Sequence, residues 1–275
     1  MTKIFFIFLN GKIQISALDK NSVNIASAVI DGDLNLSVKN ADIDDMSLSG
    51  TLTAQTDIAN INANDDLRIN SIAGNSKPYT ENLNLNVKGG ILDSSNSDNS
   101  SILAKNIDMQ AKSIGSEENP ININLAENNN VNIQAANDVV INTTGANSNI
   151  NNISSENLAL NSDKDININQ MNVETATIKT TSDNVNVEQM TITEKANISN
   201  ANKKVVVDNT NFAPVLDADL QLYLTQVPAT LELSGSNNVI TNTVNVVGKD
   251  ENILVNNNRN TGMHSAVASA AESSM

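Results

Sequence analysis

The stretch that decides the fold is DKDININQMNVETATIKTTSDNVNVEQMTITEKANIS, residues 163–199, in which one pattern occurs twice. Ile166-Asn-Ile168 returns as Val185-Asn-Val187, 19 residues later. Within each copy apolar and polar residues alternate, which is typical of a β-strand with one buried face. Strands that recur at a fixed interval indicate a solenoid, in which each coil buries its apolar face against its neighbours.

Short strands of the form apolar, polar, apolar are expected along most of the chain. Besides the opening stretch, they are expected at 13–15, 23–25, 34–36, 67–69, 83–87, 121–123, 131–133, 139–141, 158–160 and 205–207. Neighbouring strands are commonly 8–11 residues apart, so two or three of them would make one coil. We therefore predict an all-β fold, a single-stranded right-handed parallel β-helix (β-solenoid) with about 20 residues per coil.

The composition suits a narrow core. The 275 residues include no Trp, only 2% aromatic residues and 50 Asn, so the large side chains of a wide core are missing. Leu, Ile, Val and Phe nevertheless number 74, a larger share than the ~20% that marks disorder. A mainly disordered surface linker is thus the less favoured alternative.

Asparagine suits two positions in such a coil. At corners it tolerates the left-handed backbone conformation, which we expect in the runs ENNN at 127–130 and NSDK at 161–164. On the outside of strands, stacked Asn side chains can hydrogen-bond from coil to coil as an amide ladder. Asn167 and Asn186 are the expected ladder pair or, alternatively, plain surface residues.

The pattern divides the chain into four segments. Residues 1–10 are a short apolar leader or capping segment, and 11–210 form the solenoid, with a loop insertion near 75–100 where Pro78 and a Gly-Gly pair occur. Residues 211–255 are expected to form irregular or wider terminal coils. The last segment, 256–275, is expected to be a flexible or helical tail.

Charge and residue usage disfavour several function classes. A net charge of −15 without a basic patch disfavours nucleic acid as a partner, and no stretch approaches a membrane span. Without cysteine there is no disulfide framework and no thiolate metal site. The run from Ile4 to Leu9 is short for a signal peptide.

We predict no catalytic, cofactor-binding or metal-ligating residue. Residues 163–174 carry oxygens at EF-hand spacing, but Ile168 stands where that loop needs Gly, so a strand is favoured. The sole histidine, His264, lies in the tail. Three acidic pairs are interpreted as turn charges, although a carboxylate pair can also serve glycoside cleavage: Asp44 with Asp45, Asp65 with Asp66, and Glu117 with Glu118.

The segments ANDVVINTT, DKDININ and SDNVNVEQMTI resemble the repeat coils of filamentous haemagglutinin-type and leukotoxin-type filamentous adhesins. The resemblance covers residues 11–255, but the chain lacks the Asn-Pro-Asn motif of their secretion domain; ENPININ at 118–124 comes nearest. It implies a secreted shaft at the bacterial cell surface, with a longer chain or a secretion system as its expected context. No binding residue is carried over.

We therefore expect a structural and adhesive segment that presents loops to host-cell, matrix or bacterial surface ligands. It is expected to lie outside the cell or on its surface, with no cofactor and no enzymatic activity. The loops near 75–100 and at 211–235 are the expected contact regions, since loops on a regular scaffold often carry function. The alternative is a polysaccharide-acting enzyme, a lyase or glycoside hydrolase, on a pectate-lyase-like β-helix.

Overall fold

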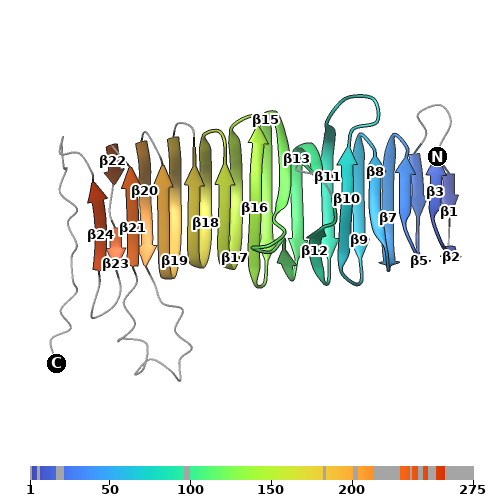
Figure 1. Cartoon of the computed structure of the whole chain (residues 1–275), viewed down its shortest axis with the longest axis horizontal. Coiled ribbons are helices and arrows are strands. Elements are labelled where there is room, and N and C mark those ends of the chain that lie inside the picture. The colour runs from blue at the N-terminus through green and yellow to red at the C-terminus, as the bar shows by residue number, and fades with distance from the viewer. Residues whose placement is uncertain are drawn as a thin grey trace, which may run out of the picture. The chain divides into compact units, whose positions relative to one another are not determined.

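The computed structural model of the chain is built from parallel β-strands that stack coil upon coil (Figure 1). It describes residues 2–4, 7–16, 22–95, 100–181, 184–200, 204–212, 230–235, 237–240, 244–246 and 252–257. The chain forms two compact units, Met1–Asn149 and Ile150–Met275. Every strand pair with a known register is parallel, and the described residues include no helix, which confirms the predicted all-β solenoid.

The strands follow one another with short connections. The first unit contains β1 (Thr2–Ile4), β2 (Ile7–Asn10), β3 (Ile13–Ser16), β4 (Ser22–Ile25), β5 (Ala28–Asp31), β6 (Leu34–Ser37), β7 (Asn40–Leu48), β8 (Thr51–Gln55), β9 (Ile58–Ala63), β10 (Leu67–Ala73), β11 (Thr80–Val87), β12 (Gly90–Asp93), β13 (Ile102–Ala111), β14 (Ser113–Ile114), β15 (Ile121–Ala135) and β16 (Asp138–Gly145). After β17 (Ser148–Ser162), the second unit contains β18 (Ile166–Thr180), β19 (Asn184–Asn200), β20 (Lys204–Phe212), β21 (Thr230–Gly235), β22 (Asn237–Ile240), β23 (Val244–Val246) and β24 (Asn252–Asn257).

The repeat at 163–199 is a pair of stacked coils. In the register of β18 and β19, Ile166 lies against Val185 and Ile168 against Val187, as the repeated sequence predicts. These four side chains are buried, because alternate residues of each strand point into the coil. In the following coil Val185 pairs with Val205, which keeps the interval close to 20 residues.

Coil length is less regular than this pair suggests. Asn24 and Asp42 face each other across 18 residues, whereas Asn60 and Asn84 do so across 24. Register shifts interrupt β10 after Ile69 and the pairing of β13 with β15. The extra residues lie at corners and bulges, so the apolar columns stay continuous while the outline of the coil changes.

The core is a set of thin columns of aliphatic side chains. Leu34, Leu52 and Ile69 stack on three successive coils and are fully buried. Each Å² of apolar surface that is buried contributes about 25 cal/mol to the free energy of folding. Because this burial is repeated in every coil, it is the main source of stability. No side chain larger than Ile or Met is needed, which accounts for the scarcity of aromatic residues.

Amide ladders run along the outside of the coils. Asn186 donates from Nδ2 to Oδ1 of Asn167 at 2.8 Å, so the predicted ladder pair is present. Equivalent Asn-to-Asn bonds join neighbouring coils elsewhere: Asn84 to Asn60, Asn106 to Asn82, Asn142 to Asn122, and Asn169 to Asn151. The predicted corner role is also confirmed at Asn128, whose φ of 54° is left-handed.

Gly11, Gly32 and Gly50 form a corner where the backbones of successive coils touch. The amide of Gly50 donates to the carbonyl oxygen of Gly32 at 3.0 Å. At Gly32, φ is 144°, and a Cβ atom there would lie 2.7 Å from the carbonyl carbon of Gly11. Only glycine allows both this conformation and this approach.

The remaining segment predictions can be compared with the described residues. Within 1–10, β1 and β2 pair with β4 and β5, so this segment forms part of the first coil. Within 75–100, β11 and β12 are strands, the chain leaves the coil at 74–79, and residues 96–99 lie outside the described residues. In 211–255, Lys195 pairs with Thr230, so this coil is longer than its neighbours. The additional residues 213–229 and the tail from 258 lie outside the described residues.

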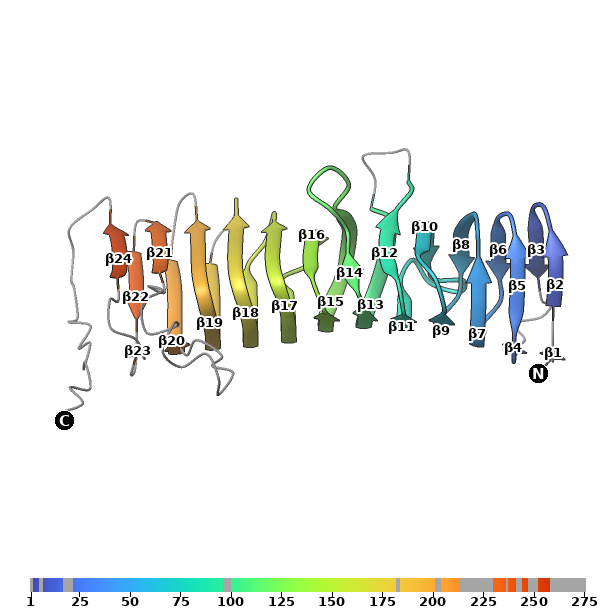
Figure 2. The same ribbon diagram turned by 90° about the horizontal axis from the view of Figure 1, so that it is seen from below.

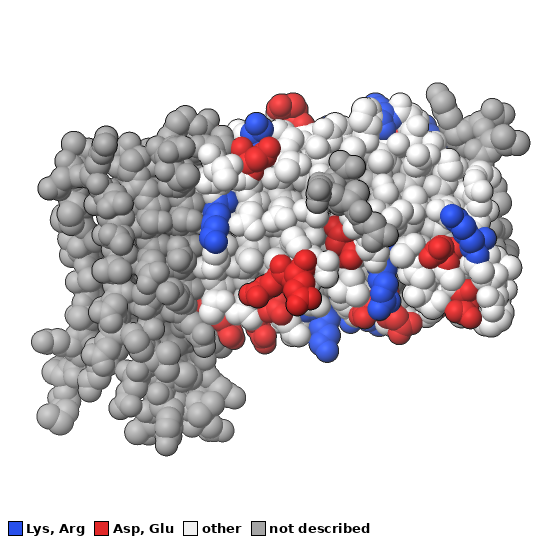
Figure 3. Space-filling model, viewed as in Figure 1, with Lys and Arg blue, Asp and Glu red and all other residues white. Residues whose placement is uncertain are grey.

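On the face drawn in Figure 3, most described residues are uncharged, and acidic side chains gather in the lower half of the view. No helix long and apolar enough to cross a membrane occurs among the residues that the structure describes.

Candidate functional site

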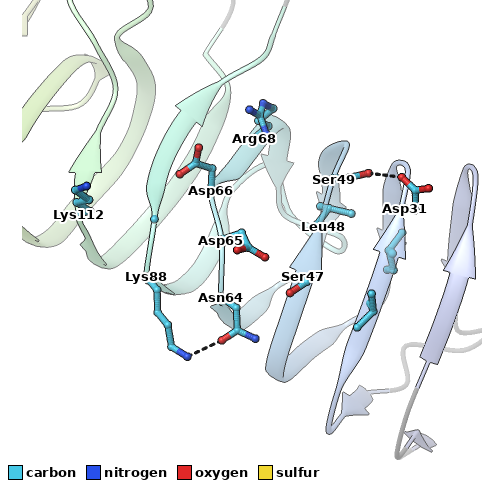
Figure 4. A pocket seen from close by; sticks show the side chains of 13 residues that line it. Asp31, Ser47, Leu48, Ser49, Asn64, Asp65, Asp66, Arg68, Lys88 and Lys112 are labelled. Atoms are coloured by element: carbon cyan, nitrogen blue, oxygen red, sulfur yellow. Dashed lines mark hydrogen bonds between the residues drawn. The ribbon is translucent and has the colours of Figure 1, made fainter.

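A shallow groove crosses one corner of the first unit and is its candidate binding site (Figure 4). We call it the corner groove; it is lined by residues 29–31, 47–49, 64–66, 68, 88, 89 and 112. These residues come from five successive coils, so the groove runs for about 19 Å at the usual strand spacing of ~4.8 Å. Its volume is about 740 Å³, within the range of ligand-binding clefts.

Strand pairing places the polar side chains of the groove. Asn64, Lys88 and Lys112 each follow directly after one of three paired strands, β9, β11 and β13. Their side chains therefore occur at the same corner of consecutive coils. Lys88 donates from Nζ to Oδ1 of Asn64 at 2.7 Å, the bond drawn in Figure 4.

The acidic side chains of the groove also hold its backbone in place. Asp66 Oδ1 accepts the amide of Gly90 at 2.8 Å, and Asp31 Oδ1 accepts the hydroxyl of Ser49 at 2.9 Å. Gly89 lies directly against Asp66, since a Cβ atom there would be 2.7 Å from the Asp66 backbone nitrogen. A glycine at this position keeps a side chain out of the groove and lets the two coils approach.

Asp33, the carboxylate of another corner, also stabilises the backbone of a neighbouring coil. Oδ1 of Asp33 accepts the backbone amide of Thr51 at 2.9 Å and its hydroxyl at 3.0 Å. These hydrogen bonds, helped by the charge of Lys12 and opposed by burial, hold the pKa of Asp33 below its ordinary value. Asp33 is thus ionised at neutral pH and stabilises the contact between two coils.

The loop at 74–79 projects from the coils between β10 and β11 (Figure 1). Oδ1 of Asp57 accepts the backbone amides of Asn75 at 3.0 Å and Ser76 at 2.8 Å. The Tyr79 hydroxyl donates to Oδ1 of Asn124 at 2.9 Å. Both ends of the loop are therefore attached to the scaffold. A further loop at 115–120 projects from another side of the coils (Figure 2).

The base of the loop carries a small ion-pair network. Lys105 donates to Glu81 at 2.7 Å, and Lys77 lies 3.7 Å from the other oxygen of Glu81. The hydrogen bond from Lys105, opposed by burial and reinforced by the charge of Lys77, lowers the pKa of Glu81. Because these groups are partly exposed, we expect the network to order the loop more than to stabilise the fold.

Replacing Asp57 by asparagine is expected to loosen the 74–79 loop in a pH-dependent manner. Burial opposes ionisation of Asp57, but the hydrogen bonds from Ser76 and Asn75 outweigh it and lower its pKa. A lowered pKa in the folded state means that the stabilisation is present above about pH 4 and is lost as the pH falls through the folded-state pKa.

The Asp57→Asn variant should thus be less stable than the parent chain by about 1 kcal/mol at pH 7. That difference should shrink as the pH falls below about 4. Urea unfolding at several pH values measures it, and amide hydrogen exchange at Asn75 and Ser76 localises it. A difference that stays constant as the pH is lowered below about 4 would contradict the assigned role of the carboxylate.

The structure separates the acidic pairs that the sequence singled out. Asp65 and Asp66 line the corner groove, close to Arg68 in sequence and in the groove lining. Glu117 and Glu118 lie in the exposed 115–120 loop, far along the chain from that groove. No group of three or more His, Cys, Asp or Glu side chains that could hold a metal ion occurs in the described part of the chain.

The EF-hand spacing at 163–174 does not form a loop. Ile166–Thr180 is the continuous strand β18, with Ile168 buried, so the alternative of an ordinary coil is confirmed there. His264 lies outside the described residues.

The corner groove was not predicted from the sequence. Of its charged residues only Asp65 and Asp66 were singled out, as an acidic pair. Lys88 and Lys112 were not. A signal was present, since each of these lysines directly follows an apolar strand, Val87 or Ala111. Reading it would have required the strand register, which the uneven coil lengths conceal.

Comparison of the chain with protein-family models, with curated proteins and with solved structures gives no match.

Proposed function

We propose that the chain is a structural and adhesive segment of a secreted bacterial surface adhesin of the filamentous haemagglutinin type. The observation that carries the proposal is the parallel coil-on-coil register, typified by Ile166 against Val185. A solenoid of this kind gives a stiff scaffold with an extended lateral surface, the form in which repeat proteins present binding sites.

The surface of the scaffold supports the same function. Outward Asn residues are occupied with one another in ladders, for example Asn84 with Asn60 at 2.6 Å, which makes much of the lateral surface regular. The loop at 74–79, held by Asp57, the loop at 115–120 and the corner groove depart from this regularity. Sites that depart from a regular scaffold are the natural places for contacts with a partner. Host-cell, matrix or bacterial surfaces are the proposed partners, and the extracellular space or cell surface is the proposed location.

A polysaccharide-acting enzyme is the second candidate, and one observation favours it. Asp65 and Asp66 share the corner groove with Arg68, a combination that could position a sugar acid beside a carboxylate pair. However, Asp66 accepts a hydrogen bond from the backbone amide of Gly90, so this carboxylate stabilises the contact between two coils. The adhesive function is therefore the one we prefer.

Bead adhesion tests the proposed function. Beads coated with the full chain should be retained on cultured host cells, on extracellular matrix or on bacterial cells several-fold more than beads coated with an unrelated acidic protein of similar size. Soluble chain added in excess should compete with the beads. Retention equal to that of the control beads on all three surfaces would contradict an adhesive function.

A further inference from the structure

The groups that remain available in the corner groove point to the chemistry of a ligand. Asp31 and Asp66 already accept hydrogen bonds from Ser49 and Gly90, and Lys88 donates to Asn64. By contrast, within the described residues the side chains of Arg68, Lys112 and Asp65 form no hydrogen bond or ion pair. Polar groups are thus left for a ligand at three places along the groove.

Two of these three groups, together with the neighbouring Lys88, favour carboxylate groups on the ligand. Arg68 is half-buried as a residue. Its guanidinium presents a planar set of donors that matches a carboxylate in a bidentate manner. Lys88 and Lys112 lie at the same corner of consecutive coils, so their charges repeat along the groove. A linear ligand with regularly spaced carboxylates would meet these cations one after another.

The acidic residues of the groove limit the charge density of that ligand. Three cations are balanced by the carboxylates of Asp31, Asp65 and Asp66, and the whole chain carries a net charge of −15. A densely charged polymer, such as a heavily sulfated glycan or a polyphosphate, would be repelled by these groups. Asp65 instead suits a hydroxyl donor, which a sugar ring supplies between its acidic groups.

The end of the groove near the first coils carries an exposed apolar side chain. Val29 lines it beside Asp31 and is 36% exposed. In the register of β2 and β5, Phe8 lies beside Val29 and is 69% exposed, so the apolar surface extends outward from the groove. Such a surface gains free energy when the C–H face of a sugar ring removes it from water.

We propose that the corner groove binds an acidic oligosaccharide, a chain of sugars with one carboxylate per unit and free hydroxyls, and that it does so without cleaving it. Arg68 and Lys112 hold carboxylates, Asp65 accepts hydroxyl donors, and Val29 contacts a ring face. The inference deepens the proposed adhesive function and rests on it, because it names the ligand class that one surface of the scaffold recognises.

Calorimetric titration of the full chain tests the inference, with tetragalacturonate as the probe and its methyl ester as the neutral control. We expect a Kd of about 0.1–1 mM for the acid at low ionic strength and at least about tenfold weaker binding of the ester. A heavily sulfated tetrasaccharide should also bind more weakly than the acid. The order of these three affinities separates recognition of carboxylates from general attraction to anions.

Charge-matched variants locate the site. Arg68→Gln and Lys112→Gln should each weaken binding of tetragalacturonate about tenfold, the effect of removing one charge-assisted contact. Lys179→Gln removes the same charge from an exposed residue of β18, outside the groove, and should leave the affinity unchanged. Circular dichroism spectra identical to that of the parent chain would establish that each variant is folded.

Absence of binding by the acid, equal binding of acid and ester, or equal affinity of Arg68→Gln and the parent chain would each overturn the inference. Shortened products after incubation would overturn the non-catalytic part and favour the enzyme alternative. If coated beads adhere to cells and the Arg68→Gln chain adheres equally well, the groove assignment fails while the adhesive function stands. If the acid binds but beads adhere to no surface, the proposed function fails instead.

Discussion

Replacing Gly32 by alanine is expected to lower the free energy of unfolding by about 2–4 kcal/mol. Two effects combine at this position. An alanine would have to adopt a φ of 144°, which L-residues rarely do, and its methyl group would overlap the carbonyl group of Gly11 on the neighbouring coil. Since Gly50 in turn donates its amide to Gly32, the disturbance should reach the coils on both sides.

Gly11→Ala is the matched control for this prediction. Gly11 also has a positive φ, 95°, but no atom lies within 4 Å of the position where its Cβ would be. The control therefore measures backbone strain alone, about 1 kcal/mol. Urea unfolding followed by circular dichroism would compare the two variants, and equal losses would show that the coils do not approach closely at Gly32.

Replacing Leu52 by alanine should lower the free energy of unfolding by about 2–5 kcal/mol, the range observed for large-to-small changes in well-packed cores. Leu52 is fully buried and lies between Leu34 and Ile69 in one column. Because each coil contacts only its two neighbours, a cavity in the middle coil weakens two interfaces at once. The narrow core also offers few side chains that could move to fill the space.

Gln55→Ala provides the control in the same strand. Gln55 ends β8 and is exposed, so its truncation should change the free energy of unfolding by no more than about 0.5 kcal/mol. Thermal and urea unfolding of both variants would test the assignment of the inward and outward faces. A Gln55→Ala loss as large as that of Leu52→Ala would mean that the register of β8 is wrong.

The fold was predictable because local pattern and tertiary packing agree. In residues 163–199 the alternation of Ile166, Ile168 and their successors specifies which face of each strand is buried, and the 19-residue interval specifies which residues stack. The same pairing predicted the amide ladder between Asn167 and Asn186. Both are consequences of identical positions recurring above one another in a parallel sheet.

Strands with a weaker pattern were missed. The segment at 40–48 forms the strand β7 although it contains Asp44 and Asp45 at a bulge, where the register with β9 shifts between Ile43 and Met46. Such a bulge places two consecutive residues on the outer side and breaks the alternation that sequence reasoning relies on. Pairing with the neighbouring coils, rather than local pattern, keeps this segment extended.

The sequence by itself determined that this chain is a β-solenoid with aliphatic columns inside and Asn on its corners and outer faces, because strand alternation and a repeat near 20 residues are local properties. Only the tertiary structure decided where a binding site could lie. Strand register places Lys88 and Lys112 at one corner, and Arg68, near the start of β10, lines the same groove. That register depends on bulges and loops whose lengths no fixed period specifies, so the groove exists only once the coils are stacked.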